Sequence, residues 1–97
     1  MQRPTLAAVV QISPDVVFRE LDGGMVILNL AGGTYYGLDE VGTRAWTLIR
    51  DGGALGPVFE ALQSEYDVAP SVLERDLLDL VGRLCEKGLA SVSLDST

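Results

Sequence analysis

The side chains that most often carry catalysis or bind metals are scarce in this 97-residue chain. It contains no histidine, the commonest general base and metal ligand in proteins. Cys85 is its only cysteine, which excludes a thiolate zinc cluster and an internal disulfide. No phosphate-binding glycine motif is present, and the sequence pairs no two carboxylates as acid and base. We therefore expect no catalytic residue, no metal site and no cofactor.

The chemistry that the chain does offer is main-chain hydrogen bonding along an apolar strand. Met25–Leu30 (Met-Val-Ile-Leu-Asn-Leu) is bounded by glycine pairs on both sides, a pattern that predicts a short β-strand. If this strand lies at the edge of its sheet, its free N–H and C=O groups are a template for an added peptide strand. Both faces of the strand carry apolar side chains, so the pattern leaves open which face is core. From the pattern alone, core packing is favoured over ligand contact.

Two further strands are predicted upstream of this one. They cover residues 8–12 and 16–21, and Asp22-Gly23-Gly24 suits a hairpin between residues 21 and 25. The three consecutive strands are most simply an antiparallel meander. Residues 1–7 show no period and are predicted to form a loosely held tail.

Three helices are expected after a turn and a short aromatic segment at residues 31–38. Asp39 is a plausible N-cap for a helix over about residues 40–50, and Pro57 suits the first turn of a second helix that runs to about residue 66. Ser71 and Glu74 have the spacing of a capping box for a third helix, Ser71–Lys87, which Gly88 ends. A last short strand or an ordered tail is expected over residues 89–94.

The third predicted helix has an apolar face that is wider than one packing contact needs. At 100° per residue, its leucines and Val81, together with Cys85, fall on one broad arc opposite a charged face. Core packing is the default role of this arc, but part of it is available to a partner. The polar face balances three acidic against three basic residues.

Composition predicts one folded domain over residues 1–97. The hydrophobic share of 47% against 22% charged residues excludes a disordered chain. The net charge of −7, with no basic cluster, argues against nucleic acid and favours a basic peptide as partner. No apolar run is long enough to cross a membrane, and no signal peptide is recognised, so a cytoplasmic location is expected.

The predicted element order is that of an α+β, winged-helix-like domain, with a three-stranded antiparallel sheet followed by three helices. Such domains often bind DNA through a third helix, but the neutral polar face here lacks the electrostatic attraction that DNA binding requires. Two alternatives to peptide binding stay open. They are a winged-helix nucleic-acid-binding regulator and a dimerisation module that pairs two strand edges.

The most distinctive run of the chain is Gly33–Gly42 (Gly-Thr-Tyr-Tyr-Gly-Leu-Asp-Glu-Val-Gly), followed by Ala45-Trp46 and Leu48-Ile49. Weaker signals follow at Leu62, Tyr66-Asp67-Val68, Asp76, Leu84 and Gly88-Leu89. Together these motifs resemble the PqqD family, the recognition elements of ribosomally made and modified peptides. The similarity spans roughly residues 9–90.

The resemblance implies a non-catalytic subunit that holds the leader segment of a precursor peptide as an extra antiparallel strand. In the family this strand lies against the third strand, in a cleft closed by the third helix, which match Met25–Leu30 and Ser71–Lys87 here. The implied client is a modifying enzyme, either the leader peptidase of a lasso-peptide pathway or the radical-SAM enzyme of pyrroloquinoline quinone synthesis.

The motif residues Tyr35, Tyr36, Leu38, Gly42 and Trp46 are then expected to be structural, fastening the first helix to the sheet. Asp76 and Asp79 are expected to attract basic leader residues, and Arg83 an acidic one. The predicted peptide-binding residues are Val26, Ile27, Leu28, Asn29, Leu30, Leu73, Asp76, Leu77, Leu80, Arg83 and Leu84.

Overall fold

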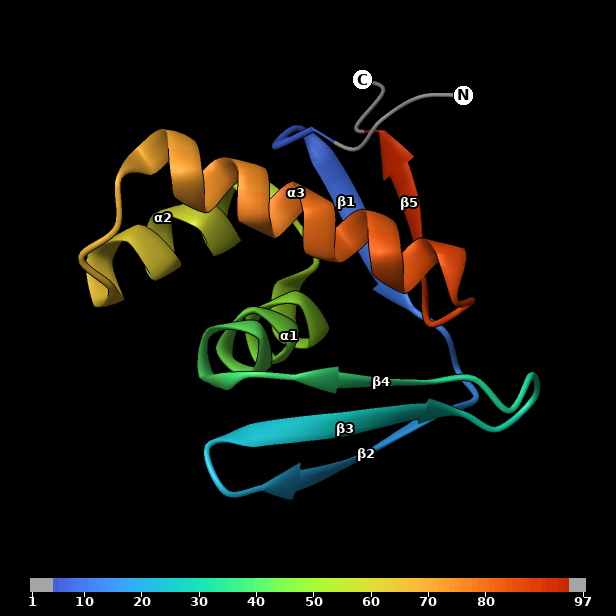
Figure 1. The fold of residues 1–97 in the computed structure, drawn as a ribbon. Helices are drawn as coiled ribbons and strands as arrows, with labels where there is room; N and C mark the ends of the chain where they lie inside the picture. The colour runs from blue at the N-terminus through green and yellow to red at the C-terminus, as the bar shows by residue number, and fades with distance from the viewer. Residues whose placement is uncertain (1–4, 95–97) are drawn as a thin grey trace.

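A three-stranded antiparallel sheet and three helices form most of the molecule, as Figure 1 shows for the computed structural model. The structure describes residues 5–94, so residues 1–4 of the predicted tail and the last residues of the predicted domain lie outside it. The α+β fold class is confirmed. In chain order the elements are β1 (Ala8–Ile12), β2 (Val16–Leu21), β3 (Gly24–Asn29), β4 (Tyr35–Leu38), α1 (Glu40–Gly52), α2 (Leu55–Glu65), α3 (Pro70–Glu86) and β5 (Ala90–Leu94).

The sheet has the order β2-β3-β4. The predicted meander of β1, β2 and β3 is therefore wrong in one of its three strands. Strand β1, predicted to begin the meander, instead pairs antiparallel with β5, with Val10 opposite Val92. Its place in the sheet is taken by Tyr35–Leu38, the predicted aromatic segment. That segment can pair because it alternates: Leu38 is buried against the core and Tyr36 is half-buried, while Tyr35 is exposed.

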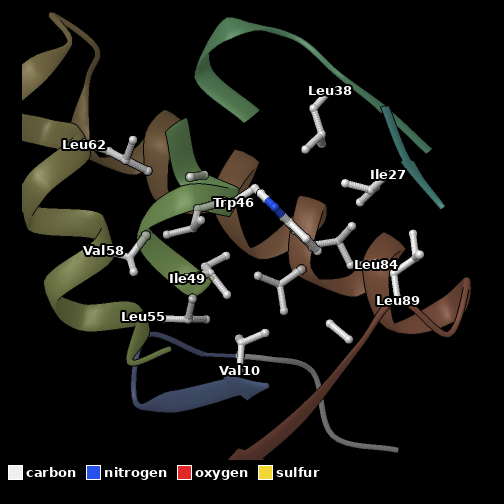
Figure 2. Close-up of a cluster of buried hydrophobic side chains, with 14 of the residues drawn as sticks. Val10, Ile27, Leu38, Trp46, Ile49, Leu55, Val58, Leu62, Leu84 and Leu89 are labelled. Atoms are coloured by element: carbon white, nitrogen blue, oxygen red, sulfur yellow. The ribbon is translucent and has the colours of Figure 1, made fainter. Parts of the chain in front are cut away.

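The core lies between the inner face of the sheet and the helices. On β3, Met25 and Ile27 are buried, whereas Val26 and Leu28 face outward, which settles the face that the sequence left open. Helix α1 lies between the sheet and α3, and Figure 2 shows the indole of Trp46 reaching into the centre of this cluster. Trp46 is 1% exposed, which confirms its structural role.

The ends of α1 and α3 show which of the predicted helix signals are correct. Asp39 caps α1 as predicted, because its Oδ1 accepts a hydrogen bond from the N–H of Gly42 at 2.7 Å. The capping box of α3 is wrong: the helix already begins at Pro70, so Ser71 lies inside the first turn, and no side chain caps it. Proline favours this start because its fixed φ suits the first helical position. Gly88, with a φ of 71°, ends the helix region and leads into β5.

None of the described helices is both long and apolar enough to cross a membrane.

Candidate functional site

Strand β3, which was predicted to offer a free edge, is the central strand of the sheet. It pairs with β2 along Gly24–Asn29 and with β4 along Met25–Leu28. Both of its backbone edges are therefore occupied, and an added strand cannot pair with it. The prediction of a free edge at Met25–Leu30 is wrong, because the strand order was taken from the chain order of the first three strands.

The free edge belongs to β4. The main-chain N–H of Asn29 donates to the carbonyl of Thr34 at 2.8 Å, which fixes the alternation of hydrogen bonds between β3 and β4. In an antiparallel pair every second residue directs its N–H and C=O to the neighbour. Tyr36 and Leu38 therefore face β3, and Tyr35 and Gly37 direct their backbone groups away from the sheet. These two residues present four main-chain groups to an incoming strand.

A groove of about 480 Å³ runs between β4 and α3. Strand β4 forms one wall, the exposed side of α3 forms the other, and the first turns of α1 form the floor. Figure 1 shows α1 lying between β4 and α3. Its lining residues are Tyr36, Gly37, Leu38, Asp39, Val41, Gly42, Ala45, Leu62, Val68, Leu73, Asp76, Leu77, Asp79, Leu80 and Arg83. The groove is thus mostly apolar with charged groups along the α3 side.

Five of the six site residues predicted on α3 line this groove. They are Leu73, Asp76, Leu77, Leu80 and Arg83. Leu73 and Leu77 are also part of the core, and the half-buried Leu80 is the leucine that the broad apolar arc leaves available. Leu84 does not line the groove, because it is fully buried on the core side of the helix.

None of the five site residues predicted on the strand lines the groove. Ile27 is completely buried, and Val26 and Leu28 lie on the outer face of the sheet. Leu30 is 62% exposed at the turn after β3. These positions contradict side-chain contact between β3 and a ligand held in the groove.

Sequence reasoning missed the strand that does line the groove. Tyr36, Leu38 and Gly42 were expected to be structural only, yet all three contribute to the groove wall or floor. The signal that could have found them is the alternation of Tyr35–Leu38 directly after a glycine turn, which is typical of the second arm of a hairpin. Asp39 both caps α1 and lines the groove.

Asn29 has a structural role at one end of the groove. Its side-chain amide donates to the carbonyl of Gly88 at 3.0 Å, and its Oδ1 accepts from the N–H of Ala31 at 3.0 Å. Close by, the hydroxyl of Thr34 donates to the carbonyl of Lys87 at 2.7 Å. These bonds tie the start of β4 to the end of α3, so they hold the two walls at a fixed separation there.

The charged groups differ along the groove. The guanidinium of Arg83 lies 3.0 Å from Asp79, and this carboxylate, followed by the hydroxyl of Tyr36, raises the pKa of Arg83 above its ordinary value. Nζ of Lys87 lies 5.9 Å from the centre of the Tyr36 ring. Asp39 and Asp76 line the other part of the groove. A bound peptide would therefore meet basic groups near Tyr36 and acidic groups elsewhere.

The described residues offer no catalytic constellation in this groove. Among residues 5–94 no cluster of three or more histidine, cysteine, aspartate or glutamate side chains is placed to hold a metal ion. Partial burial raises the pKa of the Cys85 thiol, so the reactive thiolate is disfavoured. What the arrangement can do is bind an extended chain with main-chain bonds on one wall and apolar contacts on the other.

Known proteins resemble this chain both in sequence and in structure. The family model described as coenzyme PQQ synthesis protein D (PqqD) matches residues 24–90. The solved structure of TbiB1 in complex with the TbiA(beta) leader peptide has a TM-score of 0.77 and 40% identity, covering 84% of this chain and 94% of that one. Lasso peptide synthetase B1 complexed with the leader peptide has a TM-score of 0.75 and 32% identity, covering 84% of this chain and 96% of that one. No curated protein sequence matches the chain.

Proposed function

The chain belongs to the PqqD family of peptide recognition elements, and from this premise we propose that it binds the leader segment of a ribosomally synthesised precursor peptide. It is a non-catalytic peptide-binding domain, as its family is. The observation that carries the proposal is the groove between the free edge of β4 and α3. The leader adds to β4 as an antiparallel fourth strand of the sheet. Its alternate side chains enter the groove.

Order-of-magnitude energies support this mode of binding. Up to four main-chain hydrogen bonds at ~0.5–1.5 kcal/mol each add to two or three apolar side chains at ~1.5–3 kcal/mol each. Ordering a flexible peptide and fixing it on the protein costs a large part of that sum. Micromolar to sub-micromolar affinity is the expected result. The leader residues opposite Tyr36 and Leu38 supply the apolar contacts.

The client that we propose is the leader peptidase of a lasso-peptide pathway. Both solved structures that resemble this chain hold leader peptides, and one of them is described as a lasso peptide synthetase B1. A radical-SAM enzyme of quinone-cofactor synthesis is the second candidate, because the matching family model is named for coenzyme PQQ synthesis. The role toward either enzyme is to present the precursor. Turnover by the peptidase in the presence and absence of this chain distinguishes the two.

A fluorescence anisotropy titration tests the proposal. The probe is a fluorescein-labelled leader peptide taken from any short open reading frame beside the gene for this chain, titrated with this protein alone. We expect saturable binding near micromolar, and a loss of at least tenfold when the apolar leader residues are changed to alanine. No saturation, together with a dimer mass in sedimentation, would instead assign the edge of β4 to self-pairing.

A further inference from the structure

We propose that the groove selects the direction of its peptide by charge, taking a basic side chain near Asp76 and an acidic side chain near Lys87. This inference rests on the proposed function and adds a specificity to it. The two ends of the groove differ in the charges that they present. Asp39 and Asp76 line one end without a basic residue in the lining beside them. At the other end Lys87 borders the groove without being one of its lining residues: its Nζ lies 5.9 Å from the ring centre of the lining residue Tyr36, and it makes no ion pair with any residue in 5–94.

The neighbouring ion pairs leave this contrast in place. Asp76 lies 3.5 Å from Arg75, but both side chains are mostly exposed and Arg75 is outside the groove lining. Such exposed pairs are weak and exchange readily for another partner. Arg83 and Asp79, one turn apart on α3, both line the groove, so their charges offset each other within the lining, and Lys87 supplies the net positive charge at its end.

The directions of the two walls relate these charges to the peptide's own direction. The hydroxyl of Thr34, just before β4, bonds the carbonyl of Lys87 at the end of α3, so α3 ends where β4 begins. Figure 1 shows the two elements running in opposite directions. Strand β4 thus leads from the Lys87 end toward Asp39 and Asp76. A peptide antiparallel to β4 enters at the acidic end with its N-terminal residues and leaves at the Lys87 end with its C-terminal residues.

Helix and strand geometry set the spacing of the two peptide charges. At ~1.5 Å per helical residue, Arg83 lies ~10 Å and Lys87 ~16 Å beyond Asp76 along the helix axis. A strand advances ~3.4 Å per residue, so Arg83 lies about three and Lys87 about five peptide residues beyond Asp76. Four is the even spacing within this range, and an even spacing keeps both side chains on the face of the peptide strand that points into the groove. The groove therefore fits a basic residue followed by an acidic residue about four positions later.

Charge-order isomers of the leader test this inference by anisotropy. In one set a lysine precedes a glutamate by four residues, in the other the glutamate comes first, and each pair is moved along the leader one residue at a time. We expect the lysine-first order to bind roughly 3- to 10-fold more tightly in at least one position at about 50 mM salt, and the ratio to shrink at about 0.5 M salt. Equal affinities at every position, or a preference for glutamate first, would overturn the inference and leave the proposed function standing. Loss of binding by the unmodified leader as well would overturn both.

Two double variants locate the preference in the groove. Asp76→Lys with Lys87→Glu reverses both ends at unchanged net charge and should invert the preferred order. Glu74→Lys with Arg19→Glu makes the same exchange at exposed positions outside the groove lining and should keep the original order. If the second variant also inverted the preferred order of lysine and glutamate, the peptide would be responding to the overall electrostatic field of the protein. That result would overturn the assignment to Asp76 and Lys87.

Discussion

At the scale of single residues, Leu80 and Leu84 on α3 are expected to have different roles, one in peptide binding and the other in folding. Leu80 is half-buried and lines the groove, whereas Leu84 is fully buried in the core. Both fall on the same broad apolar arc, and the sequence placed both in the site. Helical periodicity identifies the arc, but the angle at which neighbouring elements cover it depends on the packing of the whole chain.

The matched substitutions Leu80→Ala and Leu84→Ala should therefore act differently. Leu84→Ala leaves a core cavity and should lower the free energy of unfolding by ~2–5 kcal/mol. Leu80→Ala removes an apolar side chain that lines the proposed binding groove, so it should weaken leader binding about tenfold while changing the unfolding free energy by under about 1 kcal/mol. Urea denaturation and anisotropy measure the two effects. Unchanged affinity in a folded Leu80→Ala protein would remove that side chain from the proposed site.

The residue-level predictions that succeeded depend on short-range geometry. Asp39 caps α1 because a carboxylate at this position reaches an N–H three residues later. Gly23 has a φ of 72° in the hairpin turn between β2 and β3, a conformation that glycine adopts without a steric penalty. Asn29 was misread because its partner Gly88 is 59 residues away, a contact that local pattern does not encode.

At the scale of elements, the decisive feature is which strand has a free edge. The sequence predicted the type of every element except β4, which it took for a turn and aromatic segment, and β5, which it left open between a strand and an ordered tail. Strand order, by contrast, is a long-range property. Antiparallel pairing of β1 with β5 joins the two ends of the described chain, and this removes β1 from the sheet that the first strands were expected to form. The free edge of the sheet next to α3 therefore belongs to the four-residue strand Tyr35–Leu38, which is short enough to be read as a turn. The interpretation of α3 as the opposite wall agrees with the groove lining.

Gly37→Pro tests the edge of β4 without breaking the sheet. The N–H of Gly37 points away from β3, so proline removes a donor that only an added strand would use. We expect leader affinity to fall at least tenfold, while the thermal unfolding midpoint changes by only a few degrees.

Gly37→Ala is the matched control, because a Cβ at this position meets no atom within 4 Å. It keeps the donor and should bind the leader within about twofold of the parent chain, well inside the tenfold that ~1.4 kcal/mol represents. Equal affinity of the proline variant would show that the leader does not pair with β4 at Gly37.

At the scale of the whole molecule, the groove lies between two walls, β4 and α3, and hydrogen bonds fix their separation at one end. Hydrogen bonds from Asn29 and Thr34 join the sheet to the end of α3, and the other end is lined by Val68 from the α2–α3 connection. Composition and element order were sufficient for the α+β class, and the resemblance to the PqqD family indicated a strand and a helix as the two walls. The identity of that strand required the three-dimensional pairing, since the third strand of the sheet is the fourth strand of the chain.

Residue-resolved amide hydrogen exchange, measured by NMR on the free and leader-bound protein, tests the central claim most directly. The claim that the leader adds to β4 predicts that the amides of Tyr35 and Gly37 exchange much more slowly in the complex. The amides of Phe18 and Glu20, which by the same alternation face outward from the other edge of the sheet, should be unchanged. Protection at Phe18 and Glu20, or at neither edge, would contradict strand addition at β4.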